Sequence, residues 1–168
     1  MWNEIEVLRA PEPLGPALAE AVDELGWQSA LAQALSHAIT SAALFASPGA
    51  AQQRQRLLLA KDDGGCVVGF LKTGVKHLFY VSHTGQYIEM DPICVLDFYV
   101  DEAWQRRGVG LQLFQRLLQD EQVTPAQLAY DRPSPKLFAF LEKHAGLTEY
   151  FPQPNRFVVF DAYFHSRQ

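Results

Sequence analysis

A strand, a glycine loop and a helix follow one another in the middle of the chain, and this succession constrains the fold most. The segment PICVLDFYV (residues 92–100) is apolar at both alternating sets of positions, which is typical of a central strand covered on both faces. It leads into WQRRGVGLQLFQRLL (104–118), where Gly108 and Gly110 open an amphipathic helix. A glycine loop at a helix N-terminus favours anion binding, because backbone N–H groups and the helix dipole face the loop.

The N-terminal third is predicted to be one strand followed by helices. EIEVLR (residues 4–9) is typical of a short strand, and residues 14–25 place apolar side chains at helical spacing, with Gly26 as the expected end. Further helical character is expected in residues 27–36 and 38–46, with a break near Ser36 and His37, whereas SPGAAQQ (47–53) is expected to be a loop.

Three β-rich stretches come next, at residues 56–62, 66–81 and 87–100, separated by the turn sequences KDDGG (61–65) and SHTGQ (82–86). They predict an antiparallel meander. In the helix after the glycine loop, the expected apolar face consists of Leu111, Phe114, Leu117 and Leu118.

Two strands and a capped helix complete the chain. AQLAYDRPS (126–134) is typical of a short strand that ends at a turn at Asp131, and RFVVFDAYF (156–164) is expected to be the last strand. Between them, SPKLFAFLEKHAG predicts a helix with Ser134 as N-cap, Pro135 at its first position and Gly146 at its end. The predicted fold class is therefore α+β, with the glycine loop at the end of a central strand.

Composition excludes several classes of function. The 168 residues, 48% of them hydrophobic, can bury about two thirds of the unfolded surface, so one domain over residues 1–168 is expected. No apolar run approaches the roughly 20 residues that cross a bilayer, and the N-terminus lacks the pattern of a signal peptide. A soluble, intracellular protein without a membrane partner is therefore expected.

Charge and cysteine content narrow the partners further. The net charge of −5 argues against a broad nucleic-acid surface, because phosphate binding needs clustered Lys and Arg. Cys66 and Cys94 are the only cysteines of the sequence, and they lack the spacing of a zinc site, so we expect reduced thiols and no metal.

The anion can be specified from the residues around the glycines. Gln105 begins the pattern Gln-x-x-Gly-x-Gly after a buried strand, and this combination resembles the acetyl-CoA site of the GNAT N-acetyltransferases. A dinucleotide site would need a third glycine within a βαβ unit, and a phosphate loop of the Walker type would need Gly-Lys-Ser or Gly-Lys-Thr. A helix-opening turn without a ligand is the remaining alternative. The resemblance implies a mixed, mostly antiparallel central sheet with helices on both faces.

The resemblance extends to one family of that superfamily. PICVLDFYVDEAWQRRGVG (92–110) and AYDRPSPKL (129–137) resemble the α-tubulin lysine acetyltransferases, which carry Cys-x-Leu-Asp-Phe-Tyr before the loop and Asp-Arg-Pro-Ser after the next strand. The similarity covers residues 5–164. It implies an enzyme that transfers acetyl from acetyl-CoA directly to a lysine of α-tubulin in a ternary complex. It further implies a microtubule-associated monomer of the cytoplasm and cytoskeleton, cilia or flagella included.

Matched position by position, the family assigns roles to individual residues. The catalytic residues that it implies are Gln33, Cys94 and Asp131, and the substrate-facing residues are Arg132, Lys72 and Lys76. The coenzyme-binding residues that it implies are Phe98, Tyr99, Val100, Gln105, Arg106, Arg107, Gly108, Val109, Gly110, Leu111, Ser134, Lys136 and Lys143. Two positions depart from the family: Leu111 stands where a basic residue is expected, and His77 stands where lysine is usual.

Each catalytic candidate also has a structural interpretation. A lysine amine, with a pKa near 10.4, must lose a proton before it attacks a thioester, and Asp131 could accept that proton or form only a turn or an ion pair with Arg132. Cys94 could be a base, an acyl carrier or inert packing, and Gln33 could be a solvated helix residue. Asp97 either pairs with a basic group or caps a backbone kink, because an unpaired buried carboxylate is costly.

The family resemblance leaves two rival functions. One is a GNAT enzyme that acts on another protein or on a small amine. The other is a domain that binds CoA or microtubules without turnover.

Overall fold

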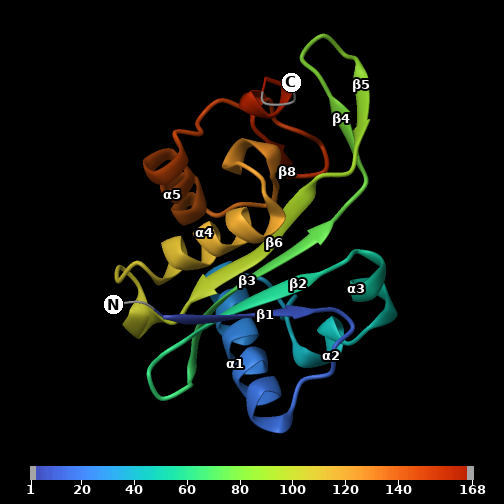
Figure 1. The fold of residues 1–168 in the computed structure, drawn as a ribbon. Coiled ribbons are helices and arrows are strands. Elements are labelled where there is room, and N and C mark those ends of the chain that lie inside the picture. Colours follow the sequence, from blue (N-terminus) through green and yellow to red (C-terminus); the bar gives the residue numbers. More distant parts are fainter. Residues whose placement is uncertain (1–2, 166–168) are drawn as a thin grey trace. The chain divides into compact units, whose positions relative to one another are not determined.

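The computed structural model of the protein describes residues 3–165, which form an α+β fold (Figure 1). The six strands of the main sheet, in hydrogen-bonded order, are β1 (Glu4–Arg9), β2 (Arg56–Lys61), β3 (Val67–Val75), β6 (Ile93–Val100), β7 (Ala129–Asp131) and β8 (Phe157–Val159). The contacts divide the chain into two compact units. One consists of residues up to Gly74 with Leu96–Glu121, and the other of Val75–Val95 with the residues from Gln122 onward. Strand β6 contributes residues to both.

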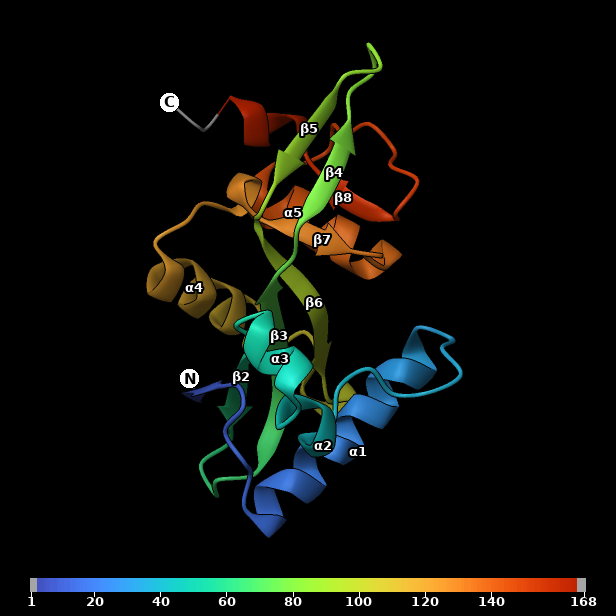
Figure 2. The same ribbon diagram turned by 90° about the vertical axis from the view of Figure 1, so that its right-hand side faces the viewer.

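The first unit is a sheet with helices on both faces. Strands β1 and β2 and strands β2 and β3 pair in antiparallel fashion. The helices are α1 (Pro16–Ala32), α2 (Ala42–Phe45), α3 (Pro48–Gln52), the 3-10 helix η1 (Glu102–Trp104) and α4 (Val109–Glu121). Helix α1 lies over one face of β1, β2 and β3, and α4 lies over the opposite face (Figure 1 and Figure 2).

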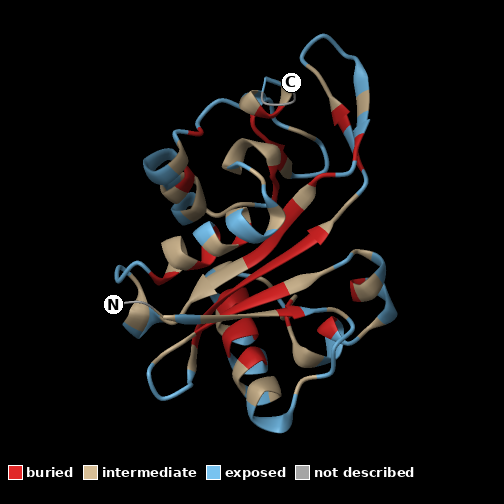
Figure 3. Ribbon diagram, in the orientation of Figure 1, coloured by how far each residue is buried: buried red, intermediate tan, exposed pale blue. Residues whose placement is uncertain are grey.

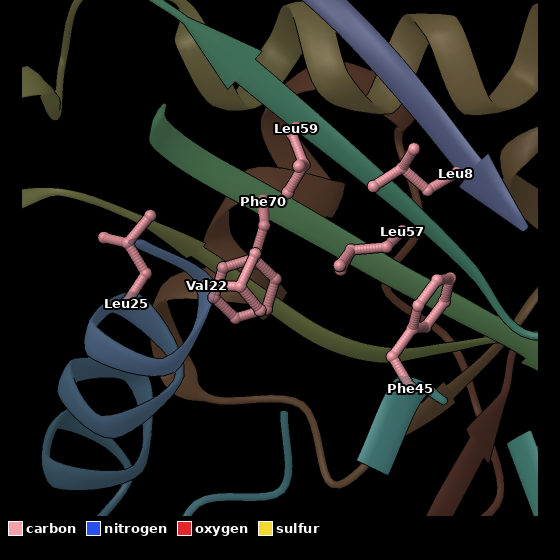
Figure 4. Close-up of a cluster of buried hydrophobic side chains, with 7 residues drawn as sticks. All are labelled: Leu8, Val22, Leu25, Phe45, Leu57, Leu59 and Phe70. Carbon is pink, nitrogen blue, oxygen red and sulfur yellow. The ribbon is translucent and has the colours of Figure 1, made fainter. Parts of the chain in front are cut away.

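The core of this unit follows the strand alternation of β2. Leu57 and Leu59 point to the face covered by α1, whereas Leu58 and Ala60 are buried on the other face. Buried residues accordingly gather along β2, β3 and β6 (Figure 3). One cluster, drawn in Figure 4, consists of Leu8, Val22, Leu25, Phe45, Leu57, Leu59 and Phe70.

The second unit combines two antiparallel pairs with one long helix. Strands β4 (Leu78–Val81) and β5 (Tyr87–Met90) form a separate hairpin. Strand β7 pairs in parallel with the start of β6, opposite Cys94 and Val95, and in antiparallel fashion with β8. The helices are η2 (Pro125–Gln127), α5 (Pro135–Ala145) and η3 (Asp161–Phe164).

The predicted fold class, the central position of β6 and the helix after the glycine loop are confirmed. The caps of α5 are confirmed as well, because the Ser134 Oγ accepts from the Leu137 N–H and Gly146 is left-handed. The buried face of α4 matches the expected one only at Phe114 and Leu117: Val109 and Leu113 are buried in addition, whereas Leu111 and Leu118 are only half-buried.

Other boundaries were predicted wrongly, each for a local reason. Helix α1 passes through Gly26 because its backbone packs on the Thr40 carbonyl, which a Cβ at Gly26 would meet at 2.0 Å. The expected loop SPGAAQQ contains α3, whose N-cap Ser47 accepts from the Ala50 N–H. The meander is interrupted, because β4 and β5 pair only with each other.

The last predicted strand ends at Val159 and gives way to η3. Within residues 3–165, no helix is long and apolar enough to span a membrane.

Candidate active site

The glycine loop joins the end of β6 to α4 within the first unit. Gln105 ties the loop to the strand, since its side-chain Nε2 donates to the Val100 carbonyl at 2.8 Å. Arg106 and Gly108 have φ angles of +67° and +83°, in the left-handed region that glycine adopts at little cost. The Gly108 carbonyl then accepts from the Gln112 N–H at 3.0 Å, which closes the first turn of α4.

The loop presents backbone donors and two cations to open space. Residues 106–108 are exposed, and a Cβ placed on Gly108 would meet no atom within 4 Å. The Arg107 guanidinium lies 4.9 Å from the centre of the Trp104 ring, a cation–π contact. Because the first N–H groups of a helix have no partner within the helix, this end of α4 fits an anion such as a pyrophosphate.

An open groove of about 730 Å³ lies beside the end of β6 in the same unit. Its size is that of a small-molecule site. It is lined by Gln28, Leu31, Ala32, Tyr99, Asp101, Glu102 and Ala103. Tyr99 is the one groove residue that was predicted from the sequence to bind the coenzyme. The α1 residues were missed because helical periodicity says nothing about which strand end a helix approaches.

Gln33 caps α1 and is half-buried, held by a cluster that the sequence did not reveal. Its Nε2 donates to the Ser29 Oγ at 2.9 Å and to the Asp97 Oδ1 at 3.1 Å. Asp97 also accepts from the Ser29 Oγ at 2.7 Å and from the Thr40 Oγ1 at 2.6 Å. We call Ser29, Gln33, Thr40 and Asp97 the Asp97 cluster. The alternative of a solvated Gln33 is therefore wrong.

Cys94 lies in β6 and belongs to the second unit. It is fully buried, and its Sγ lies 3.5 Å from the Pro92 carbonyl oxygen. Burial raises the pKa of Cys94 to about 12, against a smaller lowering by the Lys76 N–H, and the charge of Asp131 raises it further. The side chain is therefore a thiol at neutral pH, which weakens the hypotheses of a base or an acyl carrier.

Asp131 ends β7 in the same unit, two residues beyond Ala129, which pairs with Cys94. Its Oδ1 lies 3.4 Å from the Arg132 Nε, and the carboxylate side chain is 18% exposed. Arg132 has a φ of +43°, and its N–H donates to the Arg156 carbonyl at 3.1 Å. The ion pair considered from the sequence is present, and the carboxylate is still reached by solvent.

The coenzyme candidates on α5 are Ser134, Lys136 and Lys143. The Ser134 hydroxyl accepts from the Leu137 N–H at 3.2 Å and so caps the helix. Seven residues separate the two lysines, which places them roughly 10 Å apart along the axis at a rise of about 1.5 Å per residue. Lys143 lies in the last turn, where the helix dipole favours a cation.

The three basic candidates for the substrate surface differ in exposure. Lys72 is 6% exposed and its Nζ donates to the Ile39 carbonyl, so its charge is held inside the first unit and not at the surface. Lys76 is half-buried, and Arg132 is exposed. Lys72, which belongs to the first unit, is therefore much less accessible to a substrate than Lys76 and Arg132.

His77, the second departure from the family pattern, lies just before β4. Its Nδ1 is 2.8 Å from an Asp91 carboxylate oxygen and its Nε2 is 3.0 Å from a Glu89 carboxylate oxygen. The hydrogen bonds to Asp91 and to Glu89 raise the pKa of His77 above its usual 6.5. Among residues 3–165, no group of His, Cys, Asp and Glu is arranged to hold a metal ion.

Comparisons with known proteins agree on one family. A family model described as GNAT acetyltransferase, Mec-17, matches residues 3–168. An α-tubulin N-acetyltransferase of Phytophthora infestans is 71% identical over 98% of this chain and 99% of its own length. Another, from Danio rerio, is 48% identical over 94% of this chain and 52% of its own length.

The solved structures share the fold at low identity. The xEco2 acetyltransferase domain bound to a K105-CoA conjugate gives a TM-score of 0.59 at 12% identity, over 86% of this chain and 87% of that one. At this identity the likeness supports the fold alone.

Proposed function

The chain belongs to the Mec-17 family of GNAT acetyltransferases, and from that premise we propose that it transfers an acetyl group from acetyl-CoA to a lysine side chain of α-tubulin in microtubules. The observation that carries the proposal is the exposed glycine loop after β6, which opens α4 beside Arg106 and Arg107. The first N–H groups of a helix have no partner within the helix, so they can bind an anion there. The two relatives named α-tubulin N-acetyltransferase support the substrate.

The residues of the chain fit the coenzyme. The N–H groups of residues 108–111 and the guanidinium groups of Arg106 and Arg107 would hold the pyrophosphate, and the backbone of residues 98–100 would face the pantetheine arm. Ser134, Lys136 and Lys143 are the candidates from α5. When bound, acetyl-CoA supplies the acetyl group as a thioester.

Asp131 is the proposed base. The lysine amine must lose a proton before it can accept the acetyl group, and a carboxylate that solvent still reaches can take that proton directly or through one water. Arg132 beside it would then keep the carboxylate oriented and face the substrate, together with Lys76. Lys72 remains a candidate of lower accessibility, since its Nζ is engaged inside the first unit.

Transfer is proposed to be direct, within a ternary complex of enzyme, coenzyme and tubulin. A buried thiol with a pKa of about 12 is a poor acyl carrier at neutral pH, so Cys94 is assigned to packing beside the reacting groups. Gln33 is assigned to orientation of those groups. Residues 1–168 are proposed to act as one catalytic domain, and as a monomer.

The test is acetylation of polymerised tubulin by the purified chain, read by site-resolved mass spectrometry. We expect a single class of acetylated lysine on α-tubulin that depends on acetyl-CoA and is absent with Gly108→Glu. The proposal is wrong if α-tubulin gains no acetyl group, or if unrelated proteins and small amines are acetylated at the same rate.

A further inference from the structure

Among residues 3–165, Asp97 is the only buried carboxylate. It is 4% exposed, in the middle of β6. Within residues 3–165 it accepts hydrogen bonds from the hydroxyls of Ser29 and Thr40, the amide of Gln33 and the Phe98 N–H. All four donors are uncharged. A buried carboxylate is tolerated when such charge-assisted hydrogen bonds satisfy it, and they fix the donors in return.

The carboxylate determines how the Gln33 amide is oriented. An ionised carboxylate accepts hydrogen bonds only, so the Gln33 nitrogen must face Asp97 and the oxygen must point away. The Ser29 hydroxyl gives its own hydrogen to Asp97, so its lone pair accepts the other Gln33 hydrogen. Both amide hydrogens are thus used.

The Gln33 Oε1 is consequently left as an acceptor. Among the residues that the structure describes, the hydrogen bonds of the Gln33 side chain all start from Nε2, at distances of 2.9 to 3.4 Å. Gln33 is half-buried at the C-terminal end of α1, whose residues Gln28, Leu31 and Ala32 line the groove beside Tyr99. An oriented carbonyl oxygen at that end suits an N–H donor.

The two carboxylate oxygens of Asp97 have different partners: one orients Gln33, and the other anchors the segment that contains Thr40. Oδ1 contacts Ser29 and Gln33, whereas Oδ2 contacts Thr40. Thr40 belongs to the segment after α1, and its carbonyl lies so close to Gly26 that no Cβ fits between them. The Oδ2 contact therefore holds this segment against α1 without touching Gln33.

We infer that Asp97 is a positioning residue that acts through Gln33, holding its amide so that Oε1 accepts an N–H of a reactant. The inference rests on the proposed function. Two N–H groups have the required chemistry: the amine of the acceptor lysine and an amide of the pantetheine arm. Because Asp97 acts on the reactant only through the Gln33 amide, loss of Asp97 and loss of Gln33 remove the same interaction.

The test is a double-mutant cycle in single-turnover acetylation. We expect Gln33→Ala and Asp97→Ala each to lower the rate about tenfold, and the double variant to be no slower than either one. Thr40→Val is the matched control, because it removes the Oδ2 partner: its rate should stay within about threefold while its Tm falls. Additive losses in the double variant, or an equal loss in Thr40→Val, would overturn the inference.

Two further readouts complete the design. A raised KM for the acceptor with unchanged acetyl-CoA affinity assigns the N–H to lysine, and a weakened acetyl-CoA Kd assigns it to the coenzyme. Should Asp97→Ala not fold, Ser29→Ala replaces it, since it removes the hydroxyl that bridges Gln33 and Asp97.

The side-chain ¹⁵NH₂ signal of Gln33, measured without substrates, separates this inference from the proposed function. The two amide hydrogens of Gln33 should exchange with solvent slowly in the wild type and quickly in Asp97→Ala. Fast exchange in both proteins would refute the orientation even if tubulin is acetylated, and slow exchange in the wild type alone would support it even if tubulin is not.

Discussion

The glycine loop, which follows β6, and the Asp97 cluster, which is built on β6, prepare a site by opposite means. The loop has glycine where a larger side chain could cover the backbone: residues 106–108 are exposed, and a Cβ on Gly108 would meet only open space. The Asp97 cluster uses four side chains from α1, the following segment and β6, each hydrogen-bonded. A backbone site should therefore tolerate small substitutions and fail when charge is added. In the Asp97 cluster, activity should instead fall when one of the polar atoms that orient Gln33 is removed.

Asp131→Asn is expected to have the largest effect on turnover. The substitution keeps the shape of the side chain but removes the basic carboxylate, and loss of a general base lowers rates by about 10² to 10⁴-fold. Single-turnover acetylation of microtubules measures the change, with the Tm as the control for folding. A rate within a few fold of the wild type would reduce Asp131 to the partner of Arg132 in a turn.

Gly108→Glu is expected to abolish stabilisation by acetyl-CoA. A ligand that binds only the native state at 100 times its Kd adds about 2.7 kcal/mol, and the new carboxylate would repel the pyrophosphate. Gly108→Ala is the matched control: it carries the same left-handed backbone strain, about 1 kcal/mol, without the charge. A thermal shift assay with saturating coenzyme measures both. If Gly108→Ala loses the shift as completely as Gly108→Glu, strain and not charge explains the loss.

The two cysteines should differ in reactivity at neutral pH. Cys66 is exposed, whereas Cys94 is fully buried and its pKa is raised to about 12, so the thiolate is scarce there. Iodoacetamide at pH 7.4, followed by peptide mass spectrometry, should label Cys66 in the native protein and Cys94 only after unfolding. The pH dependence of turnover should be the same in Cys94→Ala, and a profile altered near neutral pH would return Cys94 to the list of bases.

The smallest effect concerns His77, on the hairpin of the second unit. Hydrogen bonds to Asp91 and Glu89 raise its pKa, so the stabilisation that protonation brings is complete below pH 6.5 and is lost as pH rises through the higher folded pKa. An NMR titration of His77 should show a midpoint above 6.5 that falls in Asp91→Asn. A midpoint at or below 6.5 in the wild type would contradict these contacts.

The features that were predicted correctly from the sequence are those determined by residues close together in the chain. Gln105, Gly108 and the apolar strand before them are neighbours in the chain, and so are Ser134 and Pro135 at the start of α5. Local chemistry decides such features, because a cap or a left-handed turn involves only a few consecutive residues.

The features that were missed depend on contacts between distant segments. No local sequence pattern around Gly26 indicates that it packs on Thr40, and the side-chain partners of Asp97 are 57 to 68 residues away in the sequence. Helical periodicity placed Gln33 on a helix but not at a buried carboxylate. The helix α3 is different, since Ser47 and Pro48 are a local start signal that the loop-like composition of SPGAAQQ concealed.

The most direct test of the central claim, that the glycine loop binds the coenzyme and separate side chains carry out the transfer, is calorimetric titration of acetyl-CoA into two variants. Asp131→Asn should bind acetyl-CoA within about twofold of the wild-type Kd although it no longer turns over, and Gly108→Glu should show no measurable binding although it remains folded. Equal loss of binding in both variants, or wild-type binding by Gly108→Glu, would contradict the account.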